Sequence, residues 1–111
     1  MPSTIPAART RAQEFDRLVA LAAADLQRTT PELAGSEVVV EDVPRLTGRV
    51  QRVPLGRVIR QTGTTQLVVH RRAVLAAGGG EDLIRDVLTE LAADILLTAP
   101  EDLDRRYPRA P

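Results

Sequence analysis

The sequence predicts an α+β fold in which two long helices pack on a small sheet. Apolar residues recur at the three- and four-residue steps of a helix in two segments, one in each half of the chain. Between them lie β-branched stretches bounded by glycine and proline. The 111 residues, 43% hydrophobic and 27% charged, suit one small globular domain. We expect this domain at residues 7–107, with a disordered N-terminus at 1–6 and a frayed, proline-containing tail at 108–111.

The first helix is predicted over residues 7–27, and a short strand follows it at 38–40. The helix has one apolar face, which is formed by Phe15, Leu18, Val19, Ala22 and Leu26. Pro31 breaks the helical pattern. The strand is a run of three valines between Gly35 and Pro44, which is too short for a helix.

A hairpin is predicted in the middle of the chain, after an extended loop at residues 44–54. The stretches 55–60 and 66–71 are β-prone, and residues 61–65 between them have the composition of a hairpin connection. Together with residues 38–40, the hairpin predicts a small twisted sheet.

The second long helix follows the three glycines at 78–80, after a short helical turn at residues 73–77. Glu81 and Asp82 lie in its first turn, where acids complement the helix dipole. Its apolar stripe consists of Ile84, Val87, Leu88, Leu91 and Ile95. Pro100 ends it, and a last helical turn can extend through Arg106.

The composition excludes several kinds of chemistry. Without cysteine there are no disulfides, thiol nucleophiles or cysteine-bound metal clusters. The single histidine, His70, cannot supply the ligands of a usual catalytic zinc site without two further carboxylates. We interpret it as a strand histidine at the surface or at a sheet edge. No signal peptide or membrane-spanning stretch is present, so we expect a cytoplasmic protein that makes no membrane contact.

The formal net charge of zero conceals an uneven distribution. Residues 43–80 carry seven arginines and no acid, whereas residues 81–104 carry one arginine and eight acids. The simplest interpretation is surface pairing between these segments, each exposed pair contributing at most ~1 kcal/mol. Alternatively, a patch for an acidic partner or nucleic acid is formed by Arg45, Arg49, Arg52, Arg57 and Arg60. No aromatic residue lies between them to stack on bases, so we do not expect nucleic-acid binding.

Three segments, taken in order, resemble the minimal zincin-like metallopeptidases of bacteria, which are single domains of about this length. The segments are VVVEDVP at 38–44, LVVHRR at 67–72 and VLTELAA at 87–93. In the family the first has the form V-V-V-E-D-x-P, and the long helix carries V-L-H-E-[IL]-[AG]-H. The resemblance runs from the first helix to the C-terminus and implies a zincin-like α+β domain.

The resemblance also implies that the family's zinc site is degenerate in this chain. In H-E-x-x-H the two histidines, at i and i+4, bind zinc, and the glutamate acts as general base on the zinc-bound water. Here Thr89 and Ala93 occupy the two histidine positions, and Glu90 alone is kept. The third ligand would fall on Ala99, or on Asp102 with a small insertion. We therefore expect no zinc, no other cofactor and no peptidase activity.

Helical geometry places the degenerate site away from the predicted core. Steps of ~100° per residue turn Thr89, Glu90 and Ala93 to the side opposite the apolar stripe, where the family's cleft would lie. We interpret Glu90 as a solvated acid, paired with Arg85 or with a central arginine. Two alternatives remain open: a weak hard-cation site with Asp94, or a site completed across an oligomer by His70.

The leading hypothesis for function is a pseudoenzyme that binds an unknown protein or peptide in the vestigial cleft, as a monomer or weak homodimer. The alternative is a small regulatory protein that binds an acidic partner or nucleic acid through its Arg-rich central segment.

Overall fold

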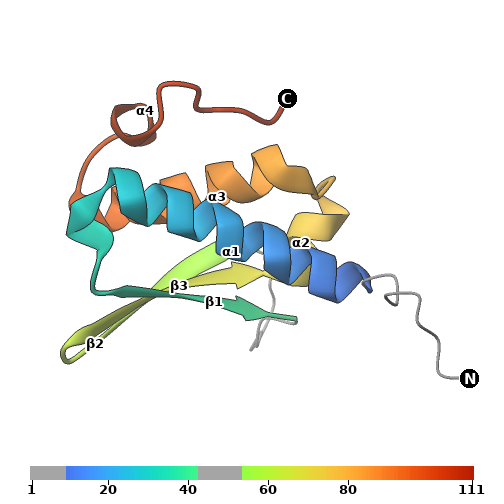
Figure 1. Cartoon of the computed structure of the whole chain (residues 1–111), viewed down its shortest axis with the longest axis horizontal. Coiled ribbons are helices and arrows are strands. Elements are labelled where there is room, and N and C mark those ends of the chain that lie inside the picture. Colours follow the sequence, from blue (N-terminus) through green and yellow to red (C-terminus); the bar gives the residue numbers. More distant parts are fainter. Residues whose placement is uncertain (1–9, 43–53) are drawn as a thin grey trace, which may run out of the picture.

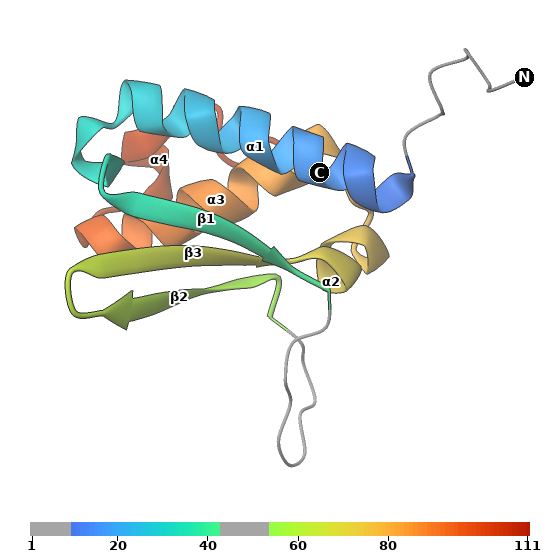
Figure 2. The same ribbon diagram turned by 60° about the horizontal axis from the view of Figure 1, so that its bottom comes forward.

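The computed structural model describes residues 10–42 and 54–111, and in them a mixed sheet lies beneath two long helices (Figures 1 and 2). The strands are β1 (Ser36–Glu41), β2 (Gly56–Gln61) and β3 (Thr64–His70), in the order β1-β3-β2. The long helices are α1 (Arg11–Thr29) and α3 (Gly80–Leu96). Short helices are η1 (Pro31–Leu33), α2 (Arg71–Ala76) and α4 (Pro100–Leu103). The predicted α+β class is confirmed.

A capping box fixes the start of α1. The Thr10 hydroxyl accepts a hydrogen bond from the backbone N–H of Gln13 at 3.1 Å, and the Gln13 side chain accepts one from the backbone N–H of Thr10 at 3.0 Å. The helix therefore begins at Arg11, later than the predicted residue 7, and ends at Thr29. Residues 1–9, including the predicted disordered N-terminus, lie outside the described residues.

The predicted hairpin is confirmed, and its turn is tight. Gln61 pairs with Thr64, so only two residues lie between the paired strands. One of them, Gly63, has φ of 79°, a conformation that L side chains rarely adopt. β3 also pairs in parallel with β1, which is longer than the predicted residues 38–40. Most of the predicted loop at 44–54 lies outside the described residues.

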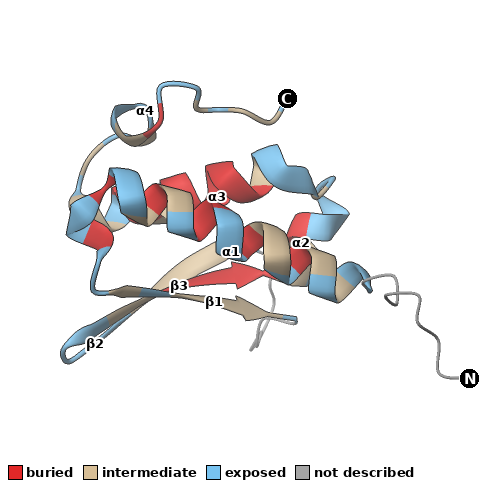
Figure 3. Ribbon diagram, in the orientation of Figure 1, coloured by how far each residue is buried: buried red, intermediate tan, exposed pale blue. Residues whose placement is uncertain are grey.

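The apolar faces of α1 and α3 pack against each other and against one face of the sheet. Figure 3 shows that buried positions gather along α3, on β3 and on the inward side of α1. The core includes Phe15 and Leu26 of α1, Leu67 and Val69 of β3, and Leu88 of α3. The stripes predicted from periodicity are thus the faces that pack. None of the helices in the described ranges is both long and apolar enough to cross a bilayer.

His70 is buried, which contradicts its predicted place at the surface or at a sheet edge. Its side chain is 1% exposed, because β3 is the central strand and has neighbours on both sides. The ring Nδ1 lies 2.8 Å from the carbonyl oxygen of Pro54. Since a carbonyl only accepts, Nδ1 carries the proton and donates.

Gly56 allows β2 to approach α3 closely. A Cβ atom at Gly56 would lie 2.8 Å from the carbonyl oxygen of Val68, 3.0 Å from Leu91 and 3.1 Å from Val87. The first of these contacts is with backbone, which cannot move without disturbing the ladder between β2 and β3.

We predict that Gly56→Ala lowers the free energy of unfolding by about 1–3 kcal/mol, because the added methyl overpacks this contact. Gly35→Ala is the matched control, since a Cβ atom at Gly35 meets nothing within 4 Å. Its effect should stay within about 0.5 kcal/mol. Urea unfolding of the two variants measures both values, and equal midpoints would contradict the prediction.

Candidate functional site

The three residues of α3 that match the family's H-E-x-x-H motif, here called the vestigial positions, are Thr89, Glu90 and Ala93. Two of them are closed to solvent. The exposed fractions are 0% for Thr89 and 2% for Ala93, whereas Glu90 is exposed. The Thr89 hydroxyl donates to the carbonyl oxygen of Arg85 at 2.8 Å. The prediction that Thr89 and Ala93 lie on the side of the helix opposite the core is therefore wrong.

The C-terminal residues 104–110, here called the strap, lie along α3. Arg109 and Ala110 donate their backbone N–H groups to the Asp86 carboxylate, at 2.9 and 2.8 Å. The Tyr107 hydroxyl donates to the Glu90 carboxylate. The predicted fraying of residues 108–111 is wrong for Arg109 and Ala110, because the Asp86 carboxylate, in a residue only 5% exposed, accepts their amides.

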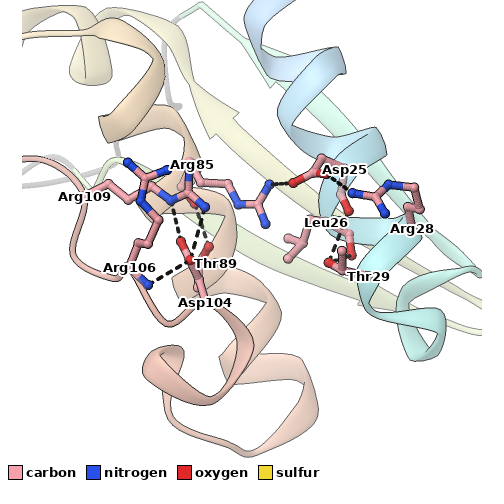
Figure 4. Close-up of polar contacts among 9 residues, drawn as sticks. All are labelled: Asp25, Leu26, Arg28, Thr29, Arg85, Thr89, Asp104, Arg106 and Arg109. Carbon is pink, nitrogen blue, oxygen red and sulfur yellow. Dashed lines mark hydrogen bonds and ion pairs between the residues drawn. The ribbon is translucent and has the colours of Figure 1, made fainter.

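The strap is also held by an internal ion pair (Figure 4). The Arg109 side chain binds the Asp104 carboxylate at 2.6 Å, and the backbone N–H of Arg106 donates to the same carboxylate at 3.1 Å. The hydrogen bond from Arg109 lowers the pKa of Asp104 below its ordinary value, although burial of the group opposes this shift. Asp104 therefore stays ionised and keeps the strap folded on itself.

Arg85 joins α3 to α1 rather than pairing with Glu90 as predicted. Its side chain is 9% exposed and forms an ion pair with Asp25 of α1 (Figure 4). Asp25 also binds Arg28 at 2.5 Å. The hydrogen bonds from Arg28 and Arg85 lower the pKa of Asp25, so this carboxylate remains charged opposite a largely buried guanidinium.

A hollow of about 630 Å³ lies beside Glu90, between α3 and the start of β2. The residues that line it are Pro54, Leu55, Gly56, Ala77, Val87, Glu90 and Leu91. Its wall combines aliphatic side chains with the Glu90 carboxylate. A hollow of this size and composition can accept an apolar side chain beside a basic or hydroxyl group.

Two of the described central arginines bind acids of other elements. Arg57 binds Glu41 of β1 at 3.0 Å, and Arg71 binds Asp16 of α1 at 2.5 Å. Arg60 reaches α3, where it contacts the backbone carbonyl of Asp94 at 3.5 Å. The predicted pairing with the acidic helix is therefore wrong for Arg57 and Arg71. The remaining arginines of the predicted patch, Arg45, Arg49 and Arg52, lie outside the described residues.

The described residues include no group of three or more His, Asp or Glu side chains placed to hold a metal ion. The ring of His70 is buried, so it would have to become accessible to complete a site across an oligomer, and that alternative stays a prediction. Pairing of Glu90 with Asp94 around a cation stays a prediction.

No model of a protein family, no characterised protein and no solved structure matches this chain. The zincin-like family therefore stays a prediction that depends on the three sequence segments. Sequence reasoning missed Asp86, Tyr107 and Asp104 as residues that shape this face of α3. No local signal marked Asp86, because its partners are backbone groups of the distant residues Arg109 and Ala110.

We predict that Tyr107 titrates with a pKa of about 12, raised chiefly by its hydrogen bond to the Glu90 carboxylate. Its stabilising contribution should be complete below pH 10 and lost as the pH rises through about 12, because the folded chain holds the phenol proton more tightly. Tyr107 is the single tyrosine and there is no tryptophan, so ultraviolet absorbance reports this phenol alone.

In Glu90→Gln the midpoint of the same titration should fall toward the ordinary value of 10.0. Glu101→Gln, which removes a smaller contribution, is the control. Identical midpoints in the wild-type chain and in Glu90→Gln would show that the two side chains do not interact in solution.

Proposed function

We propose that this chain is a non-catalytic relative of the minimal zincin-like metallopeptidases that binds a protein or peptide without zinc, as a monomer or weak homodimer. The observation that carries the proposal is the state of the two positions where the family has histidine. Ala93 has no donor atom, and the hydroxyl of Thr89 is buried against a backbone carbonyl. Glu90 alone keeps the family's residue.

The side chains at this site do not fit a zinc ion. A catalytic zinc site takes three protein ligands and leaves one position for water. Glu90 offers one carboxylate, which already accepts a hydrogen bond from Tyr107. Without a metal-bound water to deprotonate, Glu90 has no role as a general base, and we assign it to binding.

The hollow beside Glu90 supports a binding role. Its volume of about 630 Å³ is in the range of ligand sites, roughly 300–1,000 Å³. Leu55 and Leu91 contribute apolar wall, and Glu90 contributes a negative charge at the rim. We therefore propose that it takes a peptide in which an aliphatic side chain lies next to a basic one.

For zinc, the expected result is well below one equivalent in the purified full-length chain. Glu90→Ala should not change the zinc content, because one carboxylate does not retain the ion. Elemental analysis after dialysis against zinc-containing buffer measures this. One equivalent of zinc that disappears in Glu90→Ala would overturn the proposal.

For binding, peptides selected from a random display library against the full-length chain should lose at least about tenfold in affinity for Glu90→Arg, as is usual when like charges are placed together in a polar contact. Glu32→Arg, at an exposed position of η1, is the matched control and should bind as the wild-type chain does. Selected peptides that bind both variants equally would show that the hollow is not the site.

The Arg-rich alternative is separated from this proposal by its salt dependence. A labelled single-stranded oligonucleotide held by about five phosphate contacts would lose roughly 100-fold in affinity between about 50 and 200 mM salt. A peptide held in the hollow by one carboxylate and apolar contacts should change little over the same range.

A further inference from the structure

The strap is attached to α3 by hydrogen bonds, and Tyr107, Arg109 and Ala110 are partly buried. Beyond Asp104 none of its residues is fully buried, and Arg105, Arg106 and Pro108 are exposed. Its hydrogen bonds to α3 go to two carboxylates, those of Asp86 and Glu90. Because the donors are one hydroxyl and two backbone amides, another segment with the same donors can take the place of the strap.

Asp86 is the buried acceptor of this contact. Its residue is 5% exposed, and its two carboxylate oxygens accept the backbone N–H groups of two successive residues, Arg109 and Ala110. An ionised carboxylate at such a depth requires donors. Since the donors are backbone groups, a peptide whose backbone turns so that two successive N–H groups point the same way can supply them.

Glu90 adds a side-chain requirement. It follows Asp86 by four residues, so both carboxylates lie on the same face of the helix. Glu90 accepts the hydroxyl of Tyr107, which precedes the first donated amide by two residues. The two acceptors therefore fit a tyrosine followed, two residues later, by a pair of free amides.

We propose that Asp86 and Glu90 form a docking site for a turned, tyrosine-containing peptide segment of a partner protein, and that the chain's own strap occupies the site until the partner displaces it. This proposal rests on the proposed function in assigning Glu90 to binding, and it adds to the hollow a second site on the strap side of α3. The strap is tethered beside the site, which gives it an effective concentration on the order of millimolar. A free peptide of equal intrinsic affinity must compete against that concentration.

The test uses the full-length chain with a disabled strap, in the triple variant Tyr107→Phe/Arg109→Pro/Ala110→Pro. The first substitution removes the hydroxyl that donates a hydrogen bond to Glu90. Each proline removes one backbone N–H that donates to Asp86. The carboxylates themselves are unchanged. The probe is a fluorescent, N-acetylated peptide with the native sequence of residues 104–111, DRRYPRAP.

Fluorescence anisotropy should show that this peptide binds the triple variant at least about tenfold more tightly than the wild-type chain, because the tethered competitor is gone. Adding Asp86→Asn to the triple variant should remove most of that affinity. Adding Glu32→Gln instead, which removes one exposed negative charge from η1, should leave it unchanged.

Equal affinity of the peptide for the wild-type chain and the triple variant would overturn the proposal, as would full binding in the presence of Asp86→Asn. Tyr107→Phe alone leaves both backbone donors in place and gives a second, milder test, in which a smaller gain in affinity is expected. If it gives no gain and the triple variant does not fold, the proposal is also overturned.

These outcomes are separate from those that test the proposed function. Stoichiometric zinc would overturn the proposed function without changing the competition between strap and peptide. Conversely, a peptide that fails to bind the triple variant would overturn the docking site while leaving the hollow beside Glu90 to be tested with selected peptides.

Discussion

The enclosure of α3 is the constraint on which the rest of the structure depends. The helix has the sheet on one side, α1 on another and the strap along a third, so that its buried positions include Arg85, Asp86 and Thr89 as well as the apolar stripe. Buried polar groups need partners. Arg85 has Asp25 of α1, Asp86 has the amides of the strap, and Thr89 has a backbone carbonyl. These links therefore position both α1 and the strap.

Closure of this face is compatible with the small side chains at the two vestigial positions. An imidazole at either position would bring two ring nitrogens that need partners, whereas Ala93 needs none and the Thr89 hydroxyl is satisfied within its own helix. The arrangement leaves Glu90 as the exposed member of the trio, beside a hollow that Gly56 and Leu91 help to form. Glu90 is therefore the position on α3 through which we propose that a ligand binds.

Local patterns in the sequence predicted much of the fold, but they did not predict which distant residues pair. The helical stripes and the hairpin around Gly63 follow from periodicity and turn chemistry, and both are present. The capping box of Thr10 and Gln13 is also a local pattern, and it accounts for the start of α1 at Arg11 instead of the predicted residue 7. Burial of His70 depends on the parallel pairing of β3 with β1, which no local pattern encodes. The polar, proline-containing composition of the strap predicts a frayed end. Its order depends on Asp86, which is distant in the sequence and accepts hydrogen bonds from its amides.

The strand order has a consequence for the path of folding. β2 and β3 are joined by a tight turn and can pair as a local hairpin, whereas β1 must pair with β3 across a long stretch of intervening chain. Closing that larger loop costs more conformational entropy, and contacts between distant residues form slowly. The order β1-β3-β2 therefore makes the addition of β1 to a preformed hairpin the slow event in assembling the sheet, and the burial of His70 in the central strand would be completed only at that step.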